Sequence, residues 1–390
     1  MLSEKSRPVI EATLPVIGER IGEITPKFYR RLFAAHPELL DGMFSRANQG
    51  NGTQQQALAG SIAAFAAHLL ANPETLPEAV LSRIAHKHAA LGIPESGYPI
   101  VYEHLFAAIA EDLGDAVTPE VAEAWTEVYW LMADALIKIE RGLYARQANE
   151  VMWADWRVTA KDAAGAGSVT FRLEPADATA VTAATPGQYV SVRVRLADGL
   201  RQARQYSLSD AVESLTERVF TTKLDESGEV SPFLHGHVNV GDVVELSNPY
   251  GDIELDETDA PIVLATAGIG CTPSASILRS LANQASGRRV LVLHAERSAE
   301  NWALEAQMRE AVAALPNAEL RLWLEEPTAE AGAVPGFMSL DGVDLPTGAK
   351  LYLCGPLPFM RSIRSQAISA GVPATDIHYE VFGPDVWLAA

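Results

Sequence analysis

The spacing of apolar residues changes twice along the chain and divides it into three regions. From residue 1 to about 150, apolar positions recur at steps of three and four residues, which predicts helices. From about residue 156 they alternate with polar positions, as in 168–173 and 189–194, which predicts half-buried antiparallel strands. From residue 261 strand-like and helix-like stretches alternate, which predicts a parallel sheet covered by helices. We therefore expect three domains, over 1–148, 149–258 and 259–390.

Composition narrows the classes of partner. The 390 residues carry a formal net charge of −20, and a surface this acidic repels nucleic-acid phosphates and anionic lipid. The two cysteines, Cys271 and Cys354, are too few for a disulfide framework or for the ligands of an iron–sulfur cluster. No apolar run reaches the roughly 18 residues of a membrane-spanning helix, and the N-terminus has no apolar signal core. We expect a cytoplasmic protein with no nucleic-acid partner and no transmembrane segment.

A histidine lies on the predicted buried face of a helix that ends near Gly92. The apolar stripe and this histidine follow one another at steps of three and four residues: Leu81, Ile84, His88 and Leu91. His86 points elsewhere on the same helix, and Thr75 with Glu78 predicts a capping box at the helix start. A single buried histidine is more often a hydrogen-bonded core residue than a ligand.

Three other polar residues fall on or beside buried helix faces. Gln54 precedes Leu58 by one turn in a helix predicted over about 54–71, and Tyr29 flanks the apolar stripe of a helix near 21–33. Glu140 lies on the shoulder of the buried face of a third helix, near 119–147. Each residue alone is typical of a solvated or core position. Together with His88 they offer a basic ligand, an acid to orient it and two polar groups for a small bound molecule.

The helical region resembles the haem domain of the bacterial flavohaemoglobin family in a set of short motifs. They are Phe28-Tyr29 with Leu32-Phe33, His36-Pro37-Glu38-Leu39, Met43-Phe44, Asn51-Gly-Thr-Gln54, Lys87-His88, and Tyr98 with Glu103-His104-Leu105. The resemblance implies an all-α globin fold that holds haem b, with His88 as the ligand of the iron.

The same resemblance implies roles for the residues around the haem. Those that contact the cofactor are Phe44, Leu58, Lys87 and His88. Those that take part in the reaction are Tyr29 and Gln54, as distal hydrogen-bond partners of O₂, and Tyr98 and Glu140 on the proximal side. A carboxylate that accepts the other N–H of the proximal histidine raises electron density at the iron and favours activation of O₂ over storage.

The second region holds an ordered series of short motifs. Arg204-Gln205-Tyr206-Ser207 offers a guanidinium for a pyrophosphate, an aromatic face for a ring and a hydroxyl at the ring edge. Pro186-Gly-Gln-Tyr189 precedes it, and Gly228-Glu-Val230-Ser231 follows at a predicted helix start, where backbone N–H groups meet phosphate. This order resembles the antiparallel FAD-binding β-barrel of the ferredoxin-reductase-like superfamily. The FAD contacts that it implies are Tyr189, Arg204, Gln205, Tyr206, Ser207, Gly228, Val230 and Ser231.

The third region begins with a glycine-rich turn after a strand. Gly268-Ile-Gly270-Cys-Thr272-Pro273 lets the backbone approach a diphosphate, although it lacks the third glycine of the full dinucleotide fingerprint. Cys354-Gly355-Pro356 and His378-Tyr-Glu-Val381-Phe382-Gly-Pro384 follow, and the set resembles the α/β NAD(P)H-binding domain of the same superfamily. The resemblance places Cys354-Gly355-Pro356 near the nicotinamide and Phe382 near the flavin. Val381 stands where the family often has cysteine. The segment 295–298 holds both an acid and a cation, so the choice between NADH and NADPH stays open.

The joint resemblance covers nearly the whole chain and implies one activity. A flavohaemoglobin is a nitric oxide dioxygenase, which converts NO and O₂ to nitrate with electrons that pass from NAD(P)H through FAD to haem iron. Without an iron–sulfur cluster, electrons must pass from the flavin directly to the haem. Two alternatives remain: an O₂ carrier or sensor whose reductase keeps the iron ferrous, and a general NAD(P)H diaphorase or hydroperoxide reductase. We expect a monomer, and a lipid-like ligand in the haem pocket remains open.

Overall fold

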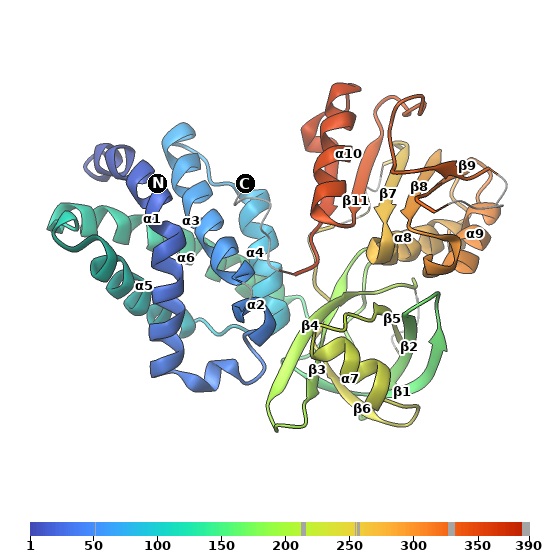
Figure 1. Ribbon diagram of the computed structural model, residues 1–390, viewed down its shortest axis with the longest axis horizontal. Coiled ribbons are helices and arrows are strands. Elements are labelled where there is room, and N and C mark those ends of the chain that lie inside the picture. Colours follow the sequence, from blue (N-terminus) through green and yellow to red (C-terminus); the bar gives the residue numbers. More distant parts are fainter. Residues whose placement is uncertain (51, 212–215, 254, 256–257, 327–331, 384–390) are drawn as a thin grey trace. The chain divides into compact units, whose positions relative to one another are not determined.

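The computed structural model describes residues 1–390 except 51, 212–215, 254, 256–257, 327–331 and 384–390 (Figure 1). Asn51 and Pro384, which belong to two of the sequence motifs, lie outside the described residues. The chain forms two compact units. The first comprises Met1–Met152 with Arg195–Arg204 and Gly383, and the second comprises Trp153–Val194 with Gln205–Phe382. No helix in the described part of the chain has the length and apolar character that crossing a membrane requires.

The first unit is helical, as predicted. Its elements are α1 (Ser6–Ala35), η1 (Pro37–Leu40), α2 (Arg46–Gly50), α3 (Thr53–Ala71), α4 (Glu78–Leu91), α5 (Gly97–Leu113), η2 (Gly114–Ala116) and α6 (Pro119–Ala145). Its core is built from the apolar stripes that the periodicity indicated, with Phe28, Leu32, Phe65, Leu69 and Leu81 almost fully buried. The helix near 21–33 is longer than predicted, because α1 begins at Ser6 and continues through two prolines.

The start of α4 corrects one prediction. No side chain caps this helix, and its N-terminal flanking residue is Pro77 rather than Thr75. The Thr75 hydroxyl is hydrogen-bonded instead to Nε2 of His68 on α3, at 3.3 Å. At the other end Gly92 adopts a left-handed conformation with φ of 72°, which a glycine allows at little cost, so the predicted helix end is confirmed.

An ion-paired carboxylate links α1 to α5 in the first unit. Asp112 accepts hydrogen bonds from Arg20 at 2.9 Å and from Lys27 at 2.6 Å. These two cations lower the pKa of Asp112 from 3.8 to about 2. A depressed pKa in the folded state means that the carboxylate stabilises the fold above the unfolded-state pKa, and that this contribution is lost as the pH falls through the folded-state pKa.

We therefore expect Asp112→Asn to lower the free energy of unfolding at pH 7. The difference from the unsubstituted chain should shrink as the pH falls from about 4 to about 2, because the native carboxyl then becomes neutral. Urea unfolding at a series of pH values measures both quantities. A difference that is constant over this range would show that the ion pairs do not cause it.

A six-stranded antiparallel sheet follows, which belongs to the second unit except for Arg195–Arg204. Its strands are β1 (Ala154–Ala163), β2 (Ser168–Pro175), β3 (Tyr189–Arg195), β4 (Arg201–Ser207), β5 (Arg218–Lys223) and β6 (Val243–Leu246), in the order β4-β3-β6-β1-β2-β5. An antiparallel bridge joins Leu208, which directly follows β4, to Phe220 on β5. The two edge strands thus meet, and the sheet closes into the predicted barrel. The helix α7 (Val230–His237) lies between β5 and β6 in the sequence.

A parallel sheet follows, as the alternation of strand-like and helix-like stretches predicted. Its order is β10-β9-β8-β7-β11-β12, from β7 (Ile262–Ala267), β8 (Val290–Glu296), β9 (Ala318–Leu324), β10 (Val334–Pro335), β11 (Lys350–Cys354) and β12 (Ile377–Glu380). The helices α8 (Cys271–Asn283) and α9 (Glu305–Ala314) pack on one face of it (Figure 1). The helix α10 (Leu357–Ser369) connects β11 to β12, and this step along the sheet runs opposite to the steps from β7 to β8 and from β8 to β9. Because such crossovers are right-handed, α10 lies on the other face of the sheet. The strand order reverses between β7 and β11, where such sheets bind ligands.

Candidate functional site

Three helices of the first unit bring together a histidine, a carboxylate and a phenol. His88 lies in the last turn of α4, Tyr98 in the first turn of α5 and Glu140 near the end of α6. The Nδ1 atom of His88 lies 2.9 Å from Oε1 of Glu140 and 3.1 Å from the hydroxyl of Tyr98. The Tyr98 hydroxyl donates to the same Oε1 at 2.6 Å. The structure thus joins three residues that the resemblance assigned to one side of a haem.

The surroundings of this cluster indicate its protonation. Glu140 is 3% exposed, and burial together with the Glu140 carboxylate raises the pKa of the Tyr98 phenol, which keeps it a donor. Because Oε1 of Glu140 faces both partners, the histidine proton belongs on Nδ1 and the lone pair on Nε2. The Tyr129 hydroxyl, for which the sequence predicted no role at the site, donates to the backbone carbonyl of Tyr98 at 2.6 Å and holds α5 against α6.

This arrangement fits haem iron. The second nitrogen of His88, Nε2, receives no hydrogen bond from the described residues, so its lone pair is available to a metal. The described residues include no group of three or more His, Cys, Asp or Glu that could hold a metal ion. A haem iron needs only one axial ligand from the protein. The side chain of His88 is 28% exposed and His86 is 8% exposed, so the histidine that was predicted to point away from the buried face is the more buried of the two.

Aromatic residues surround the predicted distal tyrosine. Tyr29 is 5% exposed, and its ring lies 5.7 Å from that of Phe33 and 6.0 Å from that of Phe44. Burial raises the pKa of the Tyr29 phenol, and the nearby Gln54 side chain acts in the opposite direction, so the hydroxyl stays protonated at neutral pH. Gln54 and Leu58 lie half-buried on the first turns of α3, one turn apart as predicted.

Strand β4 and its neighbours hold the residues predicted to bind FAD. Tyr206 stacks on Phe220, with ring centroids 5.5 Å apart and an interplanar angle of 14°. The hydroxyl of Ser207 is buried and finds no hydrogen-bond partner among the described residues, which fits a hydroxyl that serves a ligand. Gln205 is half-buried, Tyr189 is buried on β3, and Arg204 donates to the carbonyl of Ala203 at 2.7 Å.

The second predicted FAD segment begins a helix, as expected. Val230 is the first residue of α7 and is buried. Ser231 accepts a hydrogen bond from the amide of Asp225 at 3.0 Å, which folds the preceding turn back onto the helix start. A Cβ on Gly228 would lie 3.3 Å from the Asp225 carbonyl oxygen, so this turn leaves little room for a side chain.

The two glycine motifs of the third region meet at the reversal of strand order. Gly268 and Gly270 follow β7, and Cys354 and Gly355 end the neighbouring strand β11. A Cβ on Gly270 would lie 2.6 Å from the carbonyl carbon of Cys354 and 2.8 Å from the amide nitrogen of Gly355. Only glycine permits this approach of the two backbones, which fits a dinucleotide cradle. Thr272 and Pro273 are buried in the first turn of α8, and Pro356 precedes α10.

The remaining predicted residues are placed as follows. Cys354 is buried, at 3% exposure. The other cysteine, Cys271, is also buried, and burial raises the pKa of its thiol to about 12, so it is a structural rather than a reactive group. Phe382 is 45% exposed and follows β12. Lys87, next to the histidine, donates to the backbone carbonyl of Gly383 at 2.7 Å.

Comparison with known proteins decides the family. The model of the globin family matches residues 26–136, that of the oxidoreductase FAD-binding domain 155–255, and that of the oxidoreductase NAD-binding domain 264–365. A flavohemoprotein of Rhizobium meliloti (strain 1021) is 40% identical, over 99% of this chain and 100% of that protein. The chain belongs to the flavohemoprotein family. A flavohemoprotein of Chromobacterium violaceum is 42% identical over 98% of each chain.

A solved flavohemoglobin has the same architecture. The crystal structure of that protein from Malassezia yamatoensis, which has bound FAD and heme, is 45% identical. It superposes with a TM-score of 0.93 and covers 98% of this chain and 100% of that one. As a flavohemoprotein the chain is an oxidoreductase, with a globin domain for haem and two further domains for FAD and a nicotinamide dinucleotide.

Proposed function

We propose that this flavohemoprotein is a nitric oxide dioxygenase. One NO, one O₂ and one electron give one nitrate, so a hydride from NAD(P)H, which carries two electrons, supports two turnovers. When bound, the flavin divides the electron pair into single electrons and the haem iron supplies the one-electron chemistry at O₂. The observation that carries the proposal is the 2.9 Å hydrogen bond between Nδ1 of His88 and the buried carboxylate of Glu140.

The carboxylate distinguishes this reaction from O₂ storage. Glu140 accepts the Nδ1 proton of His88, which gives the imidazole anionic character and makes it a stronger electron donor through Nε2. Tyr98 shares the same carboxylate oxygen at 2.6 Å and fixes its direction. On the distal side we assign Tyr29 the donation of a hydrogen bond to O₂, with Gln54 orienting its hydroxyl.

A relative with a more specific name supports the same reaction. The solved FAD- and NAD-binding part of a nitric oxide dioxygenase from Vibrio cholerae O1 biovar El Tor is 35% identical to this chain. It covers 60% of this chain and 100% of that one, with a TM-score of 0.57. We also propose that haem, FAD and NAD(P)H belong to 1–148, 149–258 and 259–390, which contain the three family matches.

The test is the consumption of NAD(P)H by the purified, fully loaded protein in air, with and without pulses of NO. A nitric oxide dioxygenase oxidises NAD(P)H rapidly during each pulse and slows when the NO is exhausted. An O₂ carrier or sensor shows no acceleration by NO. A general diaphorase oxidises NAD(P)H with artificial acceptors, but NO does not accelerate its consumption of NAD(P)H either. The absence of an NO-dependent rate would therefore overturn the proposal.

Tyr29→Phe tests the assignment on the distal side. It removes one hydroxyl from an otherwise apolar group of rings, so we expect O₂ to dissociate about five to ten times faster, since a hydrogen bond contributes about 1 kcal/mol. Stopped-flow displacement of O₂ by CO measures the rate. Phe33→Leu, which changes a neighbouring ring but no hydrogen-bonding group, is the matched control. An unchanged rate in Tyr29→Phe would exclude this hydroxyl as the donor.

A further inference from the structure

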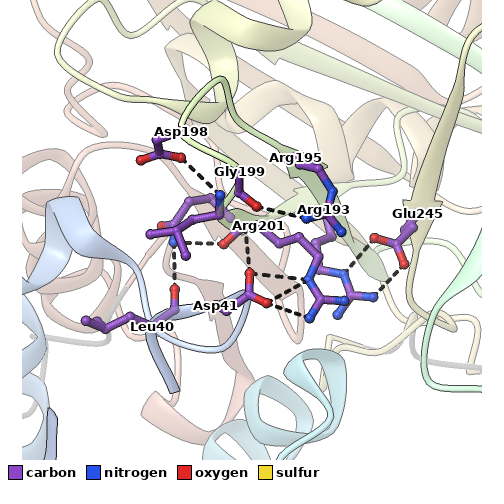
Figure 2. Close-up of polar contacts among 10 residues, drawn as sticks. Leu40, Asp41, Arg193, Arg195, Asp198, Gly199, Arg201 and Glu245 are labelled. Atoms are coloured by element: carbon purple, nitrogen blue, oxygen red, sulfur yellow. Dashed lines mark hydrogen bonds and ion pairs between the residues drawn. The ribbon is translucent and has the colours of Figure 1, made fainter. Parts of the chain in front are cut away.

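A hairpin that connects two strands of the barrel belongs by its contacts to the helical unit. Residues Arg195–Arg204 join β3 to β4, yet they form part of the first unit. Arg201 points to Asp41, which follows η1 (Figure 2). The Arg201 side chain donates to both oxygens of Asp41, from Nε to Oδ1 at 3.3 Å and from Nη2 to Oδ2 at 2.7 Å. The backbone amide of Arg201 donates to the same carboxylate at 2.7 Å.

The next residue makes a fully buried polar contact. Gln202 is 0% exposed, and its amide nitrogen donates to the carbonyl of Leu40 at 3.0 Å. Its amide oxygen accepts from the backbone amide of Arg46 at 3.2 Å. A buried amide side chain costs free energy unless both of its ends are hydrogen-bonded, and here the helical segment supplies a partner for each end. The segment that contains Leu40 and Arg46 therefore fixes the side chain of Gln202 in one orientation.

A further ion pair and a turn hold the tip of the hairpin. Asp198, near the tip of the hairpin in Figure 2, accepts from the amide of Leu200 at 3.1 Å. It also accepts from Nη1 of Arg46 at 2.5 Å. The exposed ion pairs contribute little on their own. Because Arg201, Gln202 and Asp198 engage one continuous segment, 40–46, they fix both the direction and the register of the hairpin.

The segment 40–46 is connected to two predicted cofactor contacts. On one side, β4 continues from Arg201 through Gln202 to Arg204, the predicted pyrophosphate ligand, after which the chain enters the second unit. On the other side, the segment contains Phe44, whose ring contacts those of Tyr29 and Phe33. The segment that holds the hairpin thus also contributes Phe44 to the aromatic rings around Tyr29.

We propose that Asp41 and Gln202 form a clamp through which the haem-binding unit positions β4 for FAD. Neither residue needs to touch the flavin nucleotide. They hold the strand in the register that presents the Arg204 guanidinium to the pyrophosphate. Asp41 is thereby a positioning residue for FAD although it lies in the helical unit. The inference rests on the proposed role of Arg204.

The experiment is an FAD titration of the full chain, with haem retained and FAD removed, followed by flavin fluorescence. Asp41→Asn keeps the shape of the side chain and removes the charge, and we expect the Kd for FAD to rise about tenfold. Arg201→Lys keeps the charge but loses the forked contact, so we expect an intermediate rise. Hydrogen exchange at the Arg201 amide, which donates to Asp41, should accelerate in Asp41→Asn.

The matched control is Asp112→Asn, which removes another ion-paired carboxylate of the same unit far from the hairpin in sequence. We expect it to leave the Kd for FAD within about twofold and the Arg201 amide unchanged. Equal effects of both variants would show general destabilisation and overturn the clamp. Wild-type FAD affinity in both Asp41→Asn and Arg201→Lys, with their haem content intact, would also overturn it. Wild-type affinity in Arg204→Ala would instead overturn the role of Arg204, so the two failures are distinguishable.

Discussion

Replacement of His88 by alanine is expected to abolish stable haem binding. His88 supplies the Nε2 lone pair, and its removal also leaves the buried Glu140 carboxylate with one hydrogen-bond partner fewer. Both effects weaken the site, the first by loss of the axial ligand and the second by leaving a buried charge less well paired. Haem content per chain, measured from the Soret absorbance after gel filtration, should fall about tenfold or more. Loss of a residue that only hydrogen-bonds to a metal ligand already lowers metal affinity about 10- to 100-fold, and loss of the ligand itself should cost at least as much.

The matched control is His86→Ala, which removes a buried histidine from the same helix. This variant should retain haem, because His86 has no contact with Glu140 in the cluster described above. Added imidazole should restore a haem spectrum in His88→Ala by taking the place of the missing ring. A normal Soret band in His88→Ala without imidazole would contradict the assignment of the ligand.

The second large effect is expected at Gly270. A Cβ at this position would lie within 2.8 Å of the backbone of Cys354 and Gly355, and a backbone cannot move aside as a flexible side chain can. Gly270→Ala must therefore separate the ends of β7 and β11, which form the predicted dinucleotide cradle. We expect the KM for NAD(P)H to rise about tenfold or more, since overpacking costs about 1–3 kcal/mol.

Two observations make this result specific. Haem and FAD spectra of Gly270→Ala should match those of the unsubstituted protein, because the change lies in the parallel-sheet part of the chain. Gly287→Ala, at a position where a Cβ would meet nothing within 4 Å, should leave the KM unchanged. A wild-type KM in Gly270→Ala would show that NAD(P)H does not bind at this reversal of strand order.

Periodicity predicted the order of elements because each element buries one face. The alternation in β2 and the spacing in α3 and α6 reflect contacts with neighbours that every such element makes. The prediction of a half-buried strand over 189–194 was wrong, because β3 is buried on both faces from Tyr189 to Val192. Element ends were harder to predict. Pro15 and Pro26 lie inside α1, so proline did not mark its limits, and the capping signal at Thr75 failed because Pro77 occupies the position before the helix.

The candidate site, like the fold, was predictable from the sequence only in part. Helical spacing placed His88 and Glu140 on buried faces, but their meeting depends on how α4, α5 and α6 pack, which no single helix specifies. The resemblance supplied that relation. The contact of Asp41 with Arg201 joins residues 160 positions apart, in polar segments without periodicity, so no local signal indicated it. The sequence likewise gives no sign that Gln202, a polar residue in a strand, is fully buried.

The central claim is that the protein converts NO and O₂ to nitrate with electrons from NAD(P)H. The most direct measurement is the ratio of nitrate formed to NAD(P)H consumed by the haem- and FAD-loaded protein under air with limiting NO. The electron count predicts two nitrates for each NAD(P)H, and no nitrate without NAD(P)H. Oxidation of NAD(P)H at an undiminished rate with no nitrate above the uncatalysed background would contradict it.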